Sequence, residues 1–105
     1  MNVRTKKLTV SNLVDPFIIS HHELGYWPVE YGNHQVTVNG LDGGTYTLDV
    51  RVPGDSTFQV HQPGAAEADT VIVDKPVAAA FQLRFAGLGG AAAPVVTISS
   101  WPRSI

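Results

Sequence analysis

The stretch Thr45-Tyr46-Thr47-Leu48-Asp49-Val50-Arg51-Val52 carries the clearest structural pattern in this chain. Apolar side chains occupy every second position, and polar or charged side chains stand between them. Successive side chains of a strand point to opposite faces of a sheet, so this alternation predicts a strand with one buried and one solvated face. We expect Tyr46, Leu48 and Val50 to lie in a core and Asp49 to face outward.

The same alternation recurs in two later segments. Phe81, Leu83 and Phe85 share one face of residues 80–85 and join the expected core. In residues 95–101, Val96 and Ile98 share one face, and Trp101 lies on the other. Weaker patterns predict further short strands at 8–14, 17–19, 35–38, 57–61 and 70–74.

Turn-forming residues separate these segments. Asn39-Gly40 and Asp42-Gly43-Gly44 precede the best strand and contain residues that tolerate a positive φ. Residues 65–69 are expected to form one helical turn at most. Further loops are predicted at 53–55, 62–64, 75–76 and 87–94, the last as a glycine-rich hairpin tip.

About seven short, evenly spaced strands predict an all-β fold. We expect a single antiparallel β-sandwich or small barrel, either immunoglobulin-like or jelly-roll-like. A chain of 105 residues has the usual size of one domain, so residues 1–105 are taken as one β domain. Its ends, 1–7 and 99–105, are expected to form extended arms that a partner orders.

The charge balance excludes several partner classes. Lys plus Arg is 7 and Asp plus Glu is 9, which gives a net charge of −2 and no attraction to nucleic acid or acidic membranes. The basic cluster Arg4, Lys6 and Lys7 is interpreted as a solvated terminal segment. The chain has no cysteine, which excludes disulfides and thiolate metal sites. No apolar stretch approaches the roughly 18 residues that span a bilayer.

Catalytic and metal-binding motifs are not found. His21, His22 and Glu23 form the densest cluster of metal-ligating residue types, with His34 and His61 elsewhere. His21 and His22 would point to opposite faces of a strand, and the HExxH spacing is absent, so a polar surface role is favoured. No carboxylate stands out for acid–base chemistry, because many aspartates occupy turns. We therefore predict no enzyme activity, no cofactor and no metal; a small histidine-dependent metalloenzyme is the weakest hypothesis.

The aromatic residues give the candidate interface. Tyr26, Trp27 and Tyr31 form one patch, and Trp101 and Ile105 lie beside the C-terminus. Large aromatic side chains dominate both cores and interfaces. These five residues are predicted to contact a partner, and the other interpretation of the patch is that it closes one end of the core.

Residues 41–50, Leu-Asp-Gly-Gly-Thr-Tyr-Thr-Leu-Asp-Val, resemble the beginning of a strand in many immunoglobulin-like modules. The resemblance implies that the Tyr46 hydroxyl bonds to the backbone upstream, an arrangement known as the tyrosine corner. It concerns the fold only. The Cys–Trp–Cys pattern of immunoglobulin domains is absent.

Residues 35–101 resemble small virion structural proteins of tailed bacteriophages in the order of their turns and strands: a Gly-Gly turn, Thr-Tyr-Thr-Leu, Pro-Gly-Asp, a glycine-rich loop and Val-Val-Thr-Ile. The resemblance implies a non-enzymatic capsid decoration or cement protein, or a neck or tail accessory protein. Its partners would be the major capsid protein or other virion proteins, with a homo-oligomer, first of all a trimer. Its place would be the virion, assembled in the host cytoplasm. The rival hypothesis is a carbohydrate-binding sandwich that stacks sugars on Tyr26, Trp27 and Tyr31.

Overall fold

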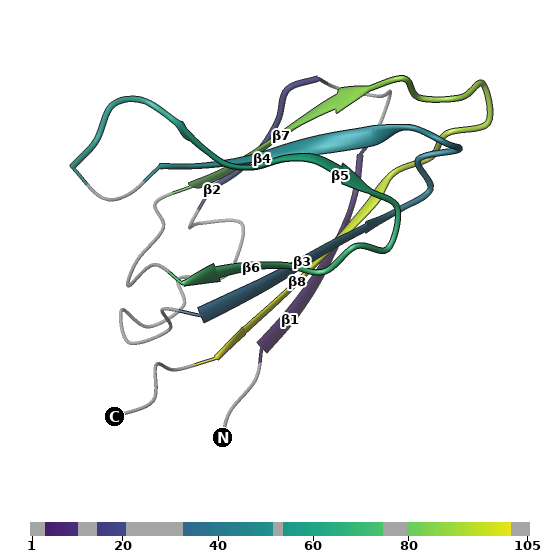
Figure 1. The fold of residues 1–105 in the computed structure, drawn as a ribbon. Coiled ribbons are helices and arrows are strands. Elements are labelled where there is room, and N and C mark those ends of the chain that lie inside the picture. The colour runs from purple at the N-terminus through teal and green to yellow at the C-terminus, as the bar shows by residue number, and fades with distance from the viewer. Residues whose placement is uncertain (1–3, 11–14, 21–32, 52–53, 75–79, 102–105) are drawn as a thin grey trace.

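The computed structural model describes residues 4–10, 15–20, 33–51, 54–74 and 80–101. All regular secondary structure in these ranges is strand, and they contain no helix long and apolar enough to cross a membrane. The strands lie in two layers that face each other (Figure 1). The eight strands are β1 (Arg4–Thr9), β2 (Phe17–Ser20), β3 (Asn33–Asn39), β4 (Thr45–Arg51), β5 (Gln59–Ala66), β6 (Val71–Asp74), β7 (Ala80–Ala86) and β8 (Val95–Trp101).

The strand order is that of a jelly roll. One four-stranded sheet, which we call sheet A, has the order β1-β8-β3-β6, and the other, sheet B, has the order β2-β7-β4-β5. The chain thus pairs its first strand with its last, its second with its seventh, its third with its sixth and its fourth with its fifth, all antiparallel. Further pairings of β8 with β3 and of β7 with β4 complete the sheets. This confirms the all-β sandwich, and of the two topologies left open by the sequence it is the jelly roll.

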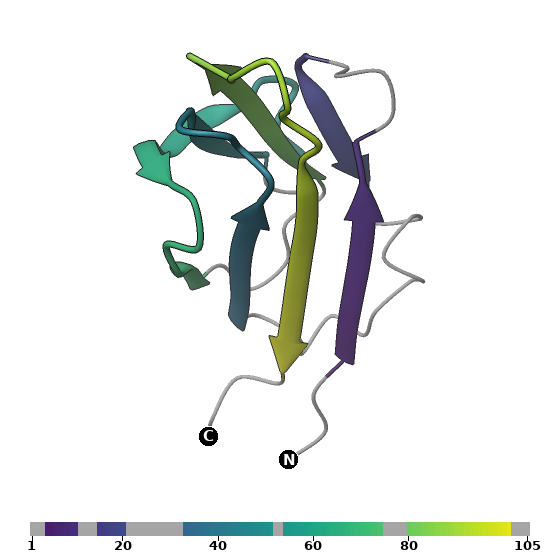
Figure 2. The same cartoon turned by 90° about the vertical axis from the view of Figure 1, so that its right-hand side faces the viewer.

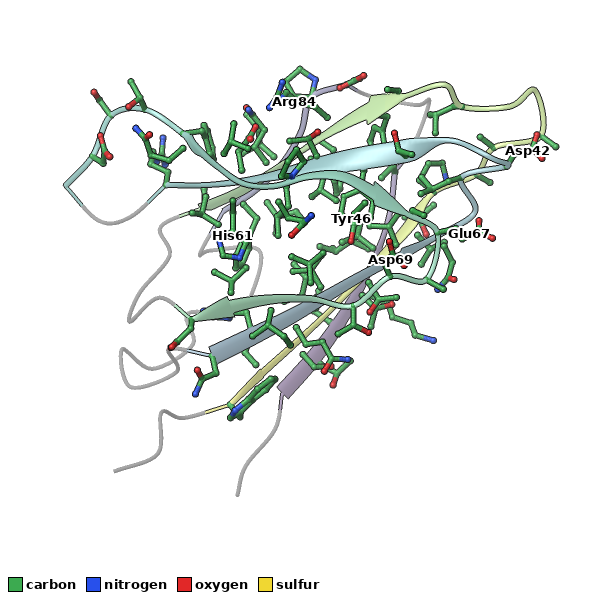
Figure 3. All side chains as sticks on the ribbon, viewed as in Figure 1. Asp42, Tyr46, His61, Glu67, Asp69 and Arg84 are labelled. Atoms are coloured by element: carbon green, nitrogen blue, oxygen red, sulfur yellow. The ribbon has the colours of Figure 1, made fainter. Side chains whose placement is uncertain are left out.

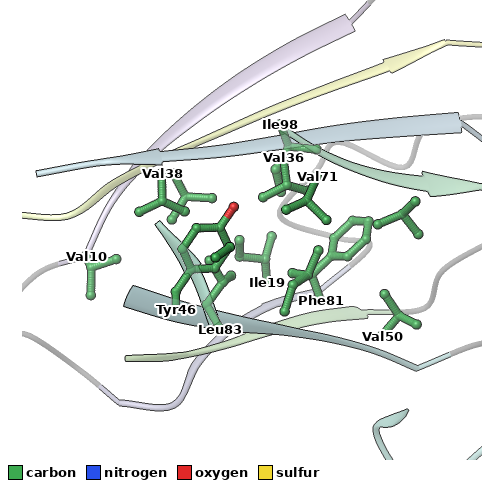
Figure 4. Close-up of a cluster of buried hydrophobic side chains, with 14 of the residues drawn as sticks. Val10, Ile19, Val36, Val38, Tyr46, Val50, Val71, Phe81, Leu83 and Ile98 are labelled. Carbon is green, nitrogen blue, oxygen red and sulfur yellow. The ribbon is translucent and has the colours of Figure 1, made fainter. Parts of the chain in front are cut away.

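The core lies between the inner faces of the two sheets (Figure 4). The predicted inward residues of β4 and β7 are confirmed: Tyr46, Leu48, Val50, Phe81 and Leu83 are buried, and Phe85 is partly buried against them. The inward residues of sheet A oppose them because β3 and β8 alternate in the same way. The buried apolar residues of sheet A are Val36, Val38, Val71, Val73, Val96 and Ile98.

The glycine-rich loop 87–94 is not the predicted hairpin tip. It connects β7 in sheet B to β8 in sheet A, and its backbone is fastened to the turn before β4. The Ala91 amide donates to Asp42 Oδ2 at 3.0 Å, and the Ala93 amide donates to the Gly40 carbonyl at 2.8 Å. Gly40 has φ +80°, and a Cβ there would collide with the Ala93 carbonyl, so this loop contact requires glycine.

Strand β5 departs most from the sequence-based expectation. It runs through Gln62-Pro63-Gly64, which was predicted as a loop, and includes Ala65 and Ala66, which were assigned to a helical turn. Among the described strands β5 lies at the edge of sheet B, where a proline, which lacks an N–H, is tolerated. The pairing with β4 shifts register between Tyr46 and Leu48 and again between Leu48 and Asp49, which absorbs the irregular residues.

Parts of both expected arms belong to the sandwich. β1 begins at Arg4 and pairs with β8, so the basic cluster lies on a strand, with Lys6 and Lys7 exposed. The strand predicted at 8–14 therefore begins earlier, and of its residues only Leu8 and Thr9 lie in β1. At the other end β8 continues through Trp101. Strand β8 pairs with β1 on one side and with β3 on the other, so residues 4–7 and 99–101 belong to sheet A.

Candidate functional site

The outer face of sheet B carries a row of four residues, one from each strand. The strand register places Ile18 of β2 beside Gln82 of β7, Gln82 beside Asp49 of β4, and Asp49 beside Val60 of β5. Residues directly opposite in a sheet share a face, so all four point away from the core. Arg84 follows Gln82 on the same face of β7, and Figure 3 shows its side chain on the outer side of the sheet. We call these five residues the Asp49 face.

Asp49 is a buried carboxylate on an outward position. Arg84 Nε donates to Oδ2 at 2.8 Å and Arg84 Nη2 donates to Oδ1 at 3.1 Å, which is a bidentate ion pair. Gln82 Nε2 also donates to Oδ2 at 2.8 Å. These side chains cover Asp49, which is only 3% exposed although it points away from the core.

The pKa of Asp49 follows from these contacts. Burial by itself would raise it, but the hydrogen bonds from Arg84 and Gln82 and the charge of Arg84 together hold the pKa of Asp49 below its ordinary value. The expected outward position of Asp49 is confirmed, whereas its ion pair was not foreseen, and the absence of a carboxylate for acid–base chemistry stays a prediction. The signal present in the sequence was that Asp49 and Arg84 both occupy the outward phase of strongly alternating strands, although their pairing was not visible.

Exposed aliphatic side chains flank this ion pair. Ile18 is 46% exposed and Val60 is 60% exposed, at opposite ends of the row. The Arg84 side chain between them keeps 48% of its surface exposed. Arginine is enriched at protein–protein contacts, and exposed aliphatic side chains gain free energy when a partner removes them from water.

The outer face of sheet A has a different chemistry. Small polar side chains line its central part, with a 3.0 Å hydrogen bond between the hydroxyl oxygens of Thr5 and Ser99, while Ile72 of the edge strand β6 is exposed. Trp101 stands at one end of this face, partly exposed, beside Asn33. The predicted interface role of Trp101 stays a prediction. The other predicted interface residues, Tyr26, Trp27, Tyr31 and Ile105, lie outside the described ranges.

His34 and His61, the two histidines in the described ranges, do not converge. His34 is buried in the core, where its Nδ1 lies 2.6 Å from Ser100 Oγ and its ring meets Phe81 edge-on at 5.2 Å. Burial lowers the pKa of His34 to about 4. His61 instead reaches from β5 to β6, where its Nε2 donates to the Ile72 carbonyl at 2.7 Å (Figure 3). Among the described residues no three metal-ligating side chains come together; His21, His22 and Glu23 lie outside them.

The predicted tyrosine corner is wrong. The Tyr46 hydroxyl is buried and has no hydrogen-bond partner in the described part of the chain, and the same holds for His34 Nε2. Burial and then the nearby charge of Asp69 raise the pKa of Tyr46 to about 12. The resemblance to immunoglobulin-like modules thus extends to the turn and the strand but not to the hydroxyl bond.

The acidic residues at one end of the sandwich bind backbone amides (Figure 3). Glu67 Oε1 accepts from the Leu41 amide at 2.7 Å, Asp69 Oδ2 accepts from the Ala66 amide at 2.9 Å, and Asp42 holds the loop 87–94 as described above. This confirms the turn role expected for the aspartates of these loops. Over the described surface no pocket was detected.

Comparisons of the chain with protein family models, with curated protein sequences and with solved structures found no match.

Proposed function

We propose that this protein is a non-enzymatic structural protein of a bacteriophage virion, and in the first place a capsid decoration protein. The Asp49 face is the observation that carries the proposal. It combines two exposed aliphatic side chains with an arginine that an ion pair already holds in place. A side chain that is held before binding loses little conformational entropy when a partner covers it, so such a face favours protein contacts.

The virion assignment rests on two further points. Residues 35–101 resemble small phage virion proteins in the order of their turns and strands, and the jelly roll is a fold of many viral capsid domains. Folds host many functions, so the jelly roll adds support without deciding the function. On a capsid, repeated copies of the same subunit contact would raise the overall affinity above that of one contact.

Sedimentation with purified capsids of the encoding phage tests this proposal. The wild-type protein should sediment with capsids, and Val60→Asp should reduce binding at least tenfold because it places a charge beside Asp49 on the proposed contact. The matched control is Ile72→Asp, since Ile72 is 48% exposed on the opposite sheet and lies outside the Asp49 face. A folded protein that binds neither capsids nor tails contradicts the proposal, and binding to tails alone selects the neck or tail alternative.

A carbohydrate-binding module is the second candidate. Trp101, partly exposed at the end of the polar face of sheet A, is a ring on which a sugar can stack, with hydroxyl and amide side chains beside it. The jelly roll also occurs in lectin domains. A glycan array with wild type and Trp101→Ala tests this candidate: retained sugar binding that the substitution abolishes would favour it over the virion assignment.

A further inference from the structure

The outer face of sheet B carries two arginines. Arg84 occupies the outward phase of β7, and Arg51 occupies the outward phase of β4, two residues after Asp49. Figure 1 and Figure 2 show the described strands of sheet A on one side of sheet B only, and both arginines belong to the other side. Arg51 is not one of the five residues of the Asp49 face but extends that face along β4. The two arginines differ in what holds them.

The charge of Arg84 is balanced within the chain. Its guanidinium makes the bidentate ion pair with Asp49, and Asp15, whose side chain is exposed, lies near it. Hydrogen bonding to Asp49, the charge of Asp49 and then the charge of Asp15 outweigh burial and raise the pKa of Arg84. With two acidic neighbours already present, Arg84 has little unbalanced charge to offer a partner.

Arg51 is held by an aromatic ring instead. Its Cζ lies 5.3 Å from the centroid of the Phe58 ring, which is a cation–π contact. No acidic side chain among the described residues forms an ion pair with Arg51, and the residue is partly exposed. Arg51 is therefore a positioned cation whose charge has no acidic counterpart in the part of the chain that the structure describes.

Apolar side chains adjoin this cation. Phe58 is partly exposed, and Val60, two positions further along an extended segment, is 60% exposed on the same face. A guanidinium is more weakly hydrated than an ammonium group, so an arginine in apolar surroundings loses less when a partner excludes water from it. Its planar donors also match the two oxygens of a carboxylate.

We infer that the partner of the Asp49 face carries a carboxylate that binds Arg51, next to an apolar side chain that packs on Phe58 and Val60. The inference rests on the proposed function, because it names the chemistry of the protein surface that this face would contact. A carboxylate fits better than the phosphates of a nucleic acid, since the whole chain has a net charge of −2. Arg84 would add contact area to the same interface but no unpaired charge.

Sedimentation with capsids at a series of salt concentrations tests the inference. Wild-type binding should weaken as salt is added, because salt screens the ion pair. Arg51→Gln should weaken binding about tenfold at low salt and should depend less on salt. Arg51→Lys keeps the charge but loses the planar group that stacks on Phe58, so it should bind with intermediate affinity. Lys7→Gln is the matched control, since it removes an exposed cation from the outer face of sheet A, and it should bind like the wild type.

Each outcome separates this inference from the proposed function. Equal capsid binding by Arg51→Gln and Lys7→Gln, or wild-type binding that salt leaves unchanged, would refute the inference alone. Displacement of the wild-type protein from capsids by a DNA fragment would assign Arg51 to phosphate groups and would refute it as well. A wild-type protein that binds neither capsids nor tails would refute the proposed function, and the inference with it. Circular dichroism checks the fold of each variant; if an arginine variant is unfolded, the salt series and the DNA competition on the wild type decide.

Discussion

Sheet A buries a polar side chain on its inner face, whereas sheet B buries one on its outer face, and the two side chains differ in the partners they have. Sheet A turns His34 into the core, where Ser100 satisfies one ring nitrogen and the other has no partner among the described residues. Sheet B turns Asp49 outward, where Arg84 and Gln82 bond to both carboxylate oxygens and cover them. A buried polar group costs little stability when it is hydrogen-bonded. It destabilises the fold when it becomes charged and no partner stabilises the charge.

This difference gives the two groups separate responses to acid. The pKa of His34 is lowered by burial, so the folded state resists a proton that the unfolded chain accepts. The pKa of Asp49 is also lowered, because its partners favour the ionised form against the effect of burial. Acid should therefore weaken the fold first through His34 and, at lower pH, through Asp49.

The largest effect is expected where the two sheets meet at Phe81. Its ring is fully buried and packs against His34. Phe81→Ala therefore leaves a cavity in the core and removes an aromatic contact that keeps the His34 imidazole away from water. We expect a loss of about 3–5 kcal/mol in the free energy of unfolding, and about 2–5 kcal/mol for Leu48→Ala. Urea denaturation followed by tryptophan fluorescence measures both. Losses below about 0.5 kcal/mol at both positions would mean that the assigned strand faces are wrong.

The acid response of His34 comes next in size. Between pH 6.5, its ordinary pKa, and about 4, its folded pKa, the unfolded state binds a proton that the folded state does not. As the pH falls through this window, the free energy of unfolding should decrease by roughly 3 kcal/mol. At still lower pH, His34 should cause no further decrease. Urea denaturation at a series of pH values should show the fall in the wild type. His34→Gln should flatten it, and an equal slope in that variant would assign the effect to other groups.

Asp49→Asn should have a smaller effect, about 1–2 kcal/mol at pH 7, because it weakens a charge-assisted network whose arginine is half exposed. The pKa of Asp49 is depressed, so its contribution is present above the ordinary value of 3.8 and is lost as the pH falls through the lower folded value. Asp55→Asn, in an exposed turn, serves as control and should cost less. A loss that persists undiminished at pH 2 would show that shape, not charge, makes the contribution.

Tyr46→Phe should have the smallest effect. The hydroxyl has no partner in the described structure, so its removal should change stability by less than about 1 kcal/mol and can increase it. The raised pKa, about 12 against 10.0, means that wild-type stability declines as the pH rises from 10 to 12 while the unfolded tyrosine ionises. Tyr46→Phe should lack this part of the decline. A loss of about 2 kcal/mol at pH 7 would instead support a tyrosine corner.

The sequence-based predictions were more accurate for the apolar core residues than for the buried polar side chains. The inward residues of β4, β7 and β8 were predicted correctly, because alternation is a local property that one strand displays by itself. The core position of His34 was not foreseen, although it occupies the inward phase of β3, because a histidine gives no apolar signal. The candidate interface was predicted from aromatic residues, whereas the Asp49 face is made of an ion pair and aliphatic side chains from four strands.

The sequence by itself determined the all-β class, most strand positions and which side of the best strands is buried, since these follow from residue spacing along the chain. Only the tertiary structure decided that the sandwich is a jelly roll, that loop 87–94 crosses between sheets, and that Pro63 lies within an edge strand. The physical reason is that an alternating strand is compatible with many partners, and its place in a sheet depends on contacts between residues far apart in the chain. Asp49 and Arg84, which are 35 positions apart, become a pair only after β4 and β7 have paired.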